Sequence, residues 1–349
     1  MDKYVTLRSK TGSFSFQVEK RAALILGGLF LCSLLLFVIC TSLGSSYIPP
    51  LAVVQQFLGI GEKEYEFILH VLRLPRVTMA YFVGAALGVS GLILQRVIRN
   101  PLGSPDIVGV TGGASGGAIV FIVFFMGSVS LRWLPLAAIL GAAIATLFIY
   151  SLSWKKGVTP IRLILIGIGI SALMNAFVTM MIVISETAVT TKAYLWLTGS
   201  FYGTNWEDVS LMVPWIVILI PLALLLTGIV NVKELGDDVA LGLGVRVQWY
   251  RFILIAISVG LAGVAVAFAG GIGFVGLIAP HVARMLLGRS FARLVLGSAM
   301  IGGLIVILAD TIARTAFLPL DIPAGVFTAG IGAPFFIYLL YRNQQRLKG

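Results

Sequence analysis

Asp310 and Arg314 are the two residues whose types and spacing most directly suggest chemistry in this chain. They stand four positions apart, which places an acid and a base on one face of a helix, within reach of an ion pair. Asp310 is the one carboxylate well inside a long apolar stretch, where an acid costs about 2.5–3.5 kcal/mol and needs a partner or water. Such a group could relay protons in an ion-coupled transporter. We favour a structural ion pair that orders the helix end, because coupled transporters usually carry several intramembrane ionisable groups and this chain has essentially one.

Other catalytic constellations are missing from the sequence. The two histidines, His70 and His281, fall on opposite predicted faces of the membrane, and no cysteine or carboxylate spacing completes a metal site. Neither histidine has a serine nucleophile and an acid in a recognisable motif. The chain contains no G-x-x-x-x-G-K-[ST] and no Gly-Lys pair, so it has no P-loop for nucleotide phosphates. We therefore predict no metal, no other cofactor and no catalytic residue, and an intramembrane enzyme is the least favoured class.

Long apolar stretches must position the remaining polar residues. Hydrophobic residues make up 59% of the 349 residues and charged residues only 11%, which is more apolar surface than a soluble chain of this length could bury. A bilayer core of about 30 Å needs about 20 apolar residues per helical crossing. The sequence predicts ten transmembrane helices, at 22–43, 77–95, 107–126, 133–153, 161–184, 209–230, 251–269, 272–287, 294–312 and 324–341.

The lysines and arginines indicate the orientation of these helices. If the N-terminus is cytoplasmic, nineteen of the 25 basic residues lie on the cytoplasmic side and six on the external side. This asymmetry follows the positive-inside rule, so the net charge of +11 is a signal of topology and not of nucleic-acid binding. Both termini are therefore predicted to be cytoplasmic, in a multi-pass protein whose surroundings are membrane lipid.

The fold class is predicted to be an all-α polytopic membrane protein with one transmembrane domain. That domain spans residues 22–341, between cytoplasmic tails at 1–21 and 342–349. We expect no cleaved signal peptide, because the first apolar stretch is of full membrane length and lacks an obvious small-residue cleavage site. The second to fifth and the seventh to tenth helices have similar lengths, and each set begins with a glycine-rich helix flanked by arginine. An offset of five helices would make the two sets inverted repeats.

Four segments between residues 70 and 340 carry distinctive motifs. They are Leu72-Arg73-Leu74-Pro75-Arg76-Val77 with the following stretch 83–91, Asn100-Pro101-Leu102-Gly103-Ser104-Pro105-Asp106, the stretch 271–284 and the stretch 321–336. Together and in this order they resemble the permease subunits of ABC importers for ferric siderophores, haem and cobalamin, the FecCD-type family. The resemblance implies ten transmembrane helices per subunit, the number reached from the apolar stretches.

The resemblance also implies a larger assembly in a bacterial cytoplasmic membrane. In such importers two permeases, identical or paralogous, enclose a central passage, a cytoplasmic pair of ABC ATPases powers it, and an extracytoplasmic binding protein delivers the cargo. The cargo implied here is an iron–siderophore complex or a similar metal chelate. The missing P-loop fits this arrangement, because the partner subunits would hydrolyse the ATP.

The external site that the resemblance implies is made of arginines. Arg73, Arg76 and Arg314 match the arginines that meet glutamates of the binding protein in this family. Exposed ion pairs contribute only about 0.2–1 kcal/mol each. Their effect would therefore fall on the orientation and rate of docking more than on tight binding.

Two further sites are implied toward the cytoplasm. Residues 234–244 resemble the short coupling helix that docks into the ATPase, with Ala240, Leu243 and Gly244 at the family's small and apolar positions. The turn at Asn100, Pro101 and Leu102 would lie along the passage and its cytoplasmic gate, together with the fifth and tenth helices.

An ion-coupled secondary transporter that uses Asp310 is the alternative from a different class. The two readings differ in their energy source. An ABC importer needs ATP hydrolysis, whereas uptake by a secondary transporter collapses when an uncoupler removes the ion gradient.

Overall fold

The computed structural model describes residues 4–8 and 15–348, which are almost entirely helical. Within this part of the chain, ten helices correspond one for one to the ten predicted spans, and the prediction is confirmed. Seven are long and apolar enough to cross a membrane, while α5, α13 and the apolar part of α15 are shorter. The helices are α1 (Lys20–Ser42), α4 (Leu74–Ile98), α5 (Val110–Phe125), α6 (Leu134–Leu152), α7 (Pro160–Val183), α9 (Trp206–Leu225), α12 (Val247–Ala269), α13 (Val275–Leu287), α14 (Phe291–Thr315) and α15 (Ala324–Lys348).

Helix boundaries differ from the prediction where the backbone leaves helical geometry. The third span begins at Val110 instead of residue 107, because η2 (Pro105–Val108) and Gly109, with a φ of 74°, precede it. The eighth span begins at Val275 instead of residue 272, because Phe274 adopts a φ of 67°. The predicted span 209–230 ends at Leu225, and α10 (Thr227–Lys233) follows as a separate helix.

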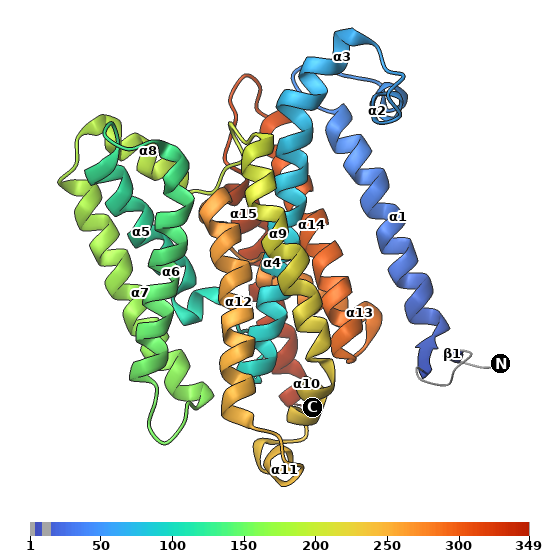
Figure 1. Cartoon of the computed structure of the whole chain (residues 1–349), viewed down its shortest axis with the longest axis vertical. Helices are drawn as coiled ribbons and strands as arrows, with labels where there is room; N and C mark the ends of the chain where they lie inside the picture. The colour runs from blue at the N-terminus through green and yellow to red at the C-terminus, as the bar shows by residue number, and fades with distance from the viewer. Residues whose placement is uncertain (1–3, 9–14, 349) are drawn as a thin grey trace.

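Short helices join the spans at both ends of the bundle. One end carries α2 (Pro50–Phe57), α3 (Lys63–Phe67), η1 (Ile68–Arg73), η3 (Leu131–Trp133) and α8 (Thr187–Leu197). Figure 1 shows α2, α3 and α8 at the top, with α10, α11 (Asp237–Gly242) and both chain termini toward the bottom. An even number of crossings brings the termini to one side, and we refer to that side as the cytoplasmic end.

The predicted N-terminal tail contains a hairpin. Strand β1 (Tyr4–Arg8) pairs antiparallel with β2 (Ser15–Glu19), and β2 runs directly into α1. This hairpin is a small departure from the all-α expectation. The other tail residues, 1–3 and 9–14 at the N-terminus and 349 at the C-terminus, lie outside the described residues. Because α15 continues to Lys348, the described part of the predicted C-terminal tail is helical.

Helix α4 is the centre of the bundle, and nearly all of its residues are buried. It packs against α12, α13 and α14. A Cβ added at Gly84 would collide with the carbonyl of Gly302 on α14, and one at Gly91 would collide with the carbonyl of Gly276 on α13. Small residues allow membrane helices to approach this closely, and their van der Waals contact holds the helices together.

The packing relates α4–α7 to α12–α15 as inverted repeats. In this relation α4, α5 and α6 are equivalent to α12, α13 and α14. The contacts follow it, because α4 packs on α14 and α12 packs on α6. Likewise α5 packs on α6 and α13 on α14, while α5 contacts α12 and α13 contacts α4. Equivalent helices are five crossings apart and therefore run in opposite directions through the membrane.

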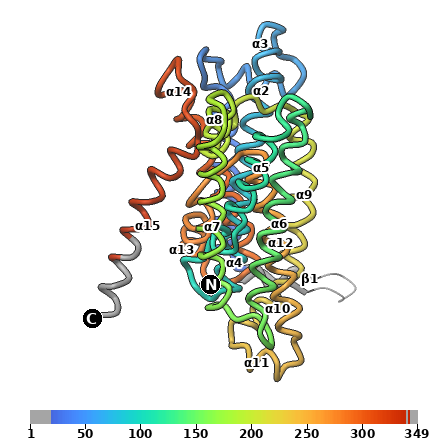
Figure 2. The backbone as a smooth tube through the Cα atoms, turned by 90° about the vertical axis from the view of Figure 1, so that its left-hand side faces the viewer, coloured from blue at the N-terminus to red at the C-terminus, as the bar shows by residue number. Residues whose placement is uncertain are grey.

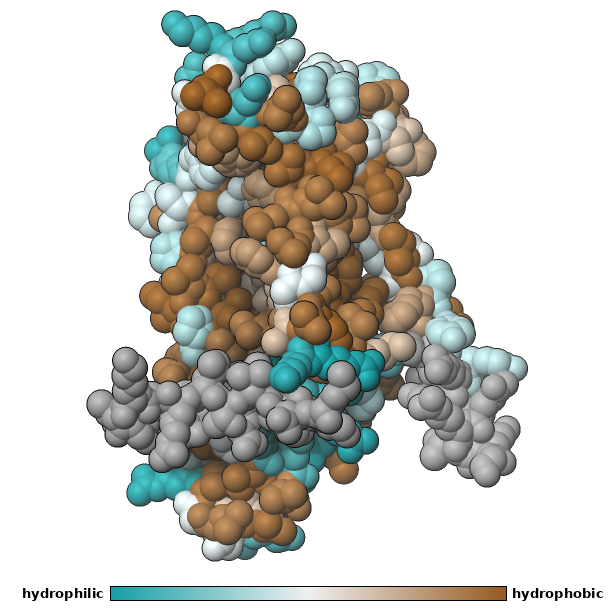
Figure 3. Space-filling model, turned by 90° about the vertical axis from the view of Figure 1, so that its right-hand side faces the viewer, coloured by the Kyte–Doolittle hydropathy of each residue, from teal (hydrophilic) through white to brown (hydrophobic). Residues whose placement is uncertain are grey.

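The face that carries α1 is apolar over its middle. Figure 3 shows hydrophobic residues across the mid-height of this face and hydrophilic residues toward its two ends. On α1 itself, large apolar side chains are exposed, among them Leu24, Phe30, Leu31 and Leu35. An apolar band bounded by polar ends is the surface that a protein presents to lipid.

Candidate functional site

The external end of the bundle, opposite α11, holds a cluster of two arginines and two aspartates. Arg76, in the first turn of α4, donates from Nε to both carboxylate oxygens of Asp310 at 3.1 Å and from Nη2 to Oδ1 at 2.8 Å. The same guanidinium pairs with Asp321, with its shortest contact from Nη1 to Oδ2 at 2.6 Å. Arg314 Nε lies 3.6 Å from Asp310 Oδ2. The Asp310 side chain is 1% exposed and that of Asp321 is 27% exposed, so solvent reaches the cluster from the Asp321 side.

Arg73 and Arg314 are held by the C-terminal end of α1. The Arg73 residue is 5% exposed, and its Nη1 donates to the carbonyls of Thr41 at 3.0 Å and Ser42 at 2.8 Å. Arg314 Nη1 donates to the carbonyl of Leu43 at 2.7 Å. The last carbonyls of a helix have no partner within the helix, and arginine side chains can satisfy them. All three arginines predicted to meet the binding protein are therefore engaged within this chain.

Helix α11 lies at the tip of the cytoplasmic end (Figure 1). Its first residue, Asp237, accepts a hydrogen bond from Arg99 Nη2 at 2.6 Å and another from Arg251 Nη2 at 2.8 Å. Arg99 immediately follows α4, and Arg251 belongs to α12. Asp237 therefore ties the short helix to the cytoplasmic ends of two core helices.

The three residues predicted to couple to an ATPase lie in or directly after α11. Ala240 is buried, whereas the Leu243 side chain is exposed. Gly244 has a φ of +81°, and a Cβ there would meet no atom within 4 Å. The α11 segment thus presents an apolar side chain and open space outward while a small residue packs inward.

The turn predicted to form a gate follows α4 at the cytoplasmic end. Asn100 Oδ1 accepts a hydrogen bond from the backbone N–H of Leu102 at 2.9 Å, which closes the turn. Pro101 and Leu102 line a cavity of about 210 Å³, together with Phe335 and Phe336 of α15 and residues of α13. The turn therefore lies against the tenth span.

Helix α7 exposes a face that changes from apolar to polar along the helix. Ile168, Ala172, Asn175 and Thr179 recur at helical spacing and are exposed in the isolated chain. Figure 2 views the molecule from the side of α7, with α15 leaning outward at the left. An asparagine within a span avoids lipid and faces protein or a water-filled space. Asn175 is therefore the residue of this face least suited to contact with lipid.

The two histidines contact aromatic side chains. Within residues 4–8 and 15–348, no group of three or more His, Cys, Asp or Glu side chains is placed to hold a metal ion. The His281 ring packs edge-on against the Phe335 ring, with centroids 5.8 Å apart. The backbone carbonyl of His70 accepts a hydrogen bond from Trp206 Nε1 at 2.7 Å.

Two of these interactions were not found from the sequence. Arg76, the closest partner of Asp310, lies 234 positions away from it, and no local pattern indicates the contact. Asp237 did carry a signal, because an acid in the first turn of a helix is a favourable N-terminal residue. Its two arginine partners come from other helices.

The fold and these sites define a polytopic helical permease, and comparison with known proteins supplies its family. Residues 31–342 match the FecCD transport family, and the chain belongs to it. It is 44% identical to the achromobactin transport system permease protein CbrC of Dickeya dadantii over 335 residues, 96% of each chain. It is also 44% identical to the iron(3+)-hydroxamate import system permease protein FhuG of Bacillus subtilis, over 90% of this chain and 95% of the relative.

A solved structure agrees with this assignment. It is described as an inward-facing conformation of a metal-chelate type ABC transporter, and it is 33% identical in sequence. The TM-score is 0.80, over 92% of this chain and 99% of the other. The protein is therefore a multi-pass permease of the bacterial cytoplasmic membrane.

Proposed function

We propose that this chain is the permease subunit of an ABC importer and forms one half of the passage for a ferric siderophore or a similar iron chelate. The match to the FecCD transport family across residues 31–342 carries the proposal. Relatives that align over nearly their full length are named for achromobactin, iron(3+)-hydroxamate and Fe(3+)-citrate. These cargoes share one chemistry, ferric iron held by an organic chelator.

ATP hydrolysis belongs to partner subunits in this proposal. The sequence contains no G-x-x-x-x-G-K-[ST] to cradle nucleotide phosphates. Helix α11 is the proposed docking element, with Ala240, Leu243 and Gly244 at the contact. Because Asp237 fixes α11 to Arg99 and Arg251, movement of an ATPase would be transmitted to the ends of α4 and α12.

An extracytoplasmic binding protein docks at the external cluster in this proposal. Arg76 is the arginine that exchanges partners, because Asp321 is the most exposed member of the cluster and can give way to a carboxylate of the incoming protein. Arg73 and Arg314 support the docking surface through their bonds to the end of α1.

A second permease, identical or paralogous, completes the passage. The exposed face of α7 supports this assignment, since Asn175 avoids lipid when it borders a passage. The turn at Asn100, Pro101 and Leu102 is the proposed cytoplasmic gate, and its cavity against α15 gives it room to move.

The ion-coupled alternative based on Asp310 is not favoured. The carboxylate is almost fully buried, and two arginines contact it. A proton-relay acid must exchange protons with water, whereas the Asp310 side chain is 1% exposed and enclosed by these arginines.

Affinity purification of the tagged chain from mild detergent, with mass spectrometry of the co-purifying subunits, tests the proposed assembly. We expect a P-loop ATPase to be recovered with the chain. Recovery of the chain alone, still active in proteoliposomes under an ion gradient, would favour the secondary transporter instead.

A further inference from the structure

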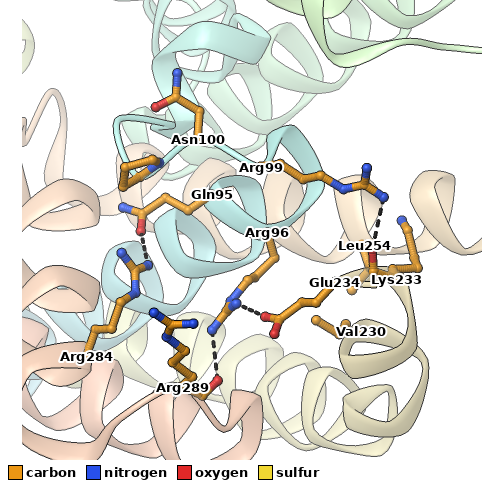
Figure 4. Close-up of a pocket in the computed structure, with 11 residues that line it drawn as sticks. Gln95, Arg96, Arg99, Asn100, Val230, Lys233, Glu234, Leu254, Arg284 and Arg289 are labelled. Carbon is orange, nitrogen blue, oxygen red and sulfur yellow. Dashed lines mark hydrogen bonds and ion pairs between the residues drawn. The ribbon is translucent and has the colours of Figure 1, made fainter. Parts of the chain in front are cut away.

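A basic cavity of about 570 Å³ lies at the cytoplasmic end, between the ends of α4, α10 and α13 (Figure 4). Five cationic side chains and one carboxylate line it. They are Arg96, Arg99, Lys233, Arg284, Arg289 and Glu234. Neither the external docking cluster nor the outward face of α11 includes this cavity.

The carboxylates in and beside the cavity leave part of its positive charge unbalanced. Glu234 pairs with Arg96, and Asp237, just outside, pairs with Arg99. Arg284 and Arg289 have no carboxylate within 4 Å among the described residues. Arg284 Nη2 donates to the amide oxygen of Gln95 at 2.9 Å, whereas the Arg289 side chain makes no hydrogen bond or ion pair with the described part of the chain.

Two buried donors in the cavity have no partner. Lys233 is 7% exposed, and its Nζ makes no hydrogen bond. Arg96 Nε is also buried and also lacks a hydrogen-bond partner. A buried charged donor without a partner is costly, and folded proteins rarely keep one unless a ligand or an ion satisfies it. Figure 4 shows the guanidinium groups of Arg289 and Arg96 facing one another on one side of the cavity, with Arg284 turned to Gln95, while the Lys233 ammonium lies on the other side of Glu234.

The donor chemistry selects an anion with several oxygen acceptors. Guanidinium groups present planar forks that match phosphate oxygens in pairs, and a lysine ammonium adds a point charge. Basic cavities between membrane helices on the cytoplasmic side are suited to phospholipid head groups. Trp154 follows α6, and Trp249 lies in the first turn of α12. Both are exposed at the cytoplasmic end of the bundle, as aromatic residues are at the membrane interface. Val230 and Leu254 supply an apolar wall.

We propose that this cavity binds a phosphate group, supplied either by an anionic phospholipid head group or by a soluble phosphate compound. Arg284 and Arg289 would contact the bound group from one side of the cavity and Lys233 from the other, and Arg96 would turn its free Nε toward it. The cavity also includes Asn100 and Pro101 of the proposed gate, and Glu234 lies just before α11. A bound phosphate would therefore brace the gate turn against the segment that leads to the coupling helix.

Arg289→Gln and Lys233→Met are the variants that test this proposal. The Arg289 change removes an exposed cation whose side chain makes no hydrogen bond or ion pair with the described part of the chain, so the fold should tolerate it. Arg246→Gln and Lys156→Met are the matched controls, one for each cavity variant, because both residues are cytoplasmic, exposed and outside the cavity. Thermal unfolding of each purified protein verifies that it is folded.

Binding is measured on the full chain with the subunits that co-purify with it. Native mass spectrometry counts cardiolipin or phosphatidylglycerol retained from defined nanodiscs, and calorimetry measures inorganic phosphate binding in phosphatidylcholine nanodiscs. We expect one of these probes to bind and each cavity variant to weaken it by about tenfold, the loss of one charge-assisted hydrogen bond. Each control should retain the wild-type affinity.

The lipid measurement and the inorganic phosphate measurement together identify the source of the phosphate. Retained anionic lipid that inorganic phosphate does not displace assigns the cavity to a lipid head group, and phosphate binding without anionic lipid assigns it to a soluble compound. Binding of neither probe would overturn the proposal, as would equal binding by the cavity variants and the controls. If an acidic side chain of the ATPase fills the cavity instead, neither probe binds to the assembled complex.

Discussion

At the scale of single residues, the external cluster depends on an aspartate shared by two arginines. Asp310 cannot reach water, so its charge is balanced by Arg76 and Arg314 alone. The arginines in turn connect α4, α14 and the end of α1. Loss of the central carboxylate would leave the buried Arg314 without a carboxylate and Arg76 with Asp321 alone, which is more costly than loss of an exposed pair.

Asp310→Asn is therefore expected to destabilise the protein strongly. Removing one partner of a buried ion pair costs about 3–5 kcal/mol. Asp321→Asn, at the exposed side of the same cluster, should cost much less because water can replace its carboxylate. Thermal unfolding of both variants in detergent measures the difference, and equal melting temperatures would show that Asp310 is not the centre of the cluster.

Asp321→Asn should also accelerate docking of the binding protein. In the proposed exchange, Asp321 competes with the partner's carboxylate for Arg76, and an exposed pair is worth about 0.2–1 kcal/mol, or up to about fivefold in rate. Surface plasmon resonance at low salt measures the association rate. Glu207→Gln, an exposed external acid with the same change in charge, is the control. Slower docking by Asp321→Asn alone would mean that Asp321 itself attracts the partner.

Lys233 provides a prediction of pH dependence at the cytoplasmic end. Burial and the nearby Arg251 lower the pKa of the Lys233 ammonium from its ordinary 10.5 to about 8, although Asp237 opposes the change. Between pH 8 and 10.5 the unfolded chain therefore holds a proton that the folded chain has released. The free energy of unfolding must rise with pH across this window.

The comparison of wild type with Lys233→Met isolates this effect. Both proteins are unfolded thermally in detergent, in phosphate-free buffer, at several pH values within the window. The wild type should gain stability relative to the variant as the pH increases. A constant difference between the two proteins would contradict the lowered pKa.

At the scale of elements, the apolar stretches were sufficient to predict all ten spans. The predicted start of the helix was wrong before Gly109 and Phe274, because hydropathy does not report φ. At these residues the backbone is left-handed, and the helix begins at the next residue. The β1–β2 hairpin was missed since the tail was read only as polar. The contacts of Arg73 and Arg314 could not be predicted either, because their partners are main-chain carbonyls at the end of a distant helix, and any sequence supplies those.

Gly244→Trp tests the role of the α11 segment. The space around Gly244 is open, so the main structural cost is the positive φ, about 1 kcal/mol for a residue with a side chain. The fold should persist while the indole blocks the proposed ATPase contact. Gly228→Trp, at an open position on α10, is the control.

Co-purified ATPase per permease is the readout for these two variants. We expect a drop of at least about tenfold for Gly244→Trp, the size of a hot-spot loss at an interface. The Gly228→Trp protein should retain the wild-type ratio. Normal ATPase recovery with Gly244→Trp would exclude this segment as the docking element.

At the scale of the whole molecule, the inverted repeats and their exposed faces describe half of a transport device. Helices α4, α12 and α14 form a tightly packed centre, while α7 leaves polar residues uncovered inside the membrane. The helix α3, next to the start of α4, and α11 lie at opposite ends of the molecule (Figure 1), so the two proposed docking surfaces would not compete for space. A second permease against α7 and α15 would enclose the passage.

The most direct test of this account is uptake of a ferric siderophore by proteoliposomes that contain the chain with its co-purified ATPase and its binding protein. We predict uptake that requires hydrolysable ATP on the ATPase side and persists when a protonophore abolishes the ion gradient. Uptake that proceeds without ATP and stops with the protonophore would contradict the account.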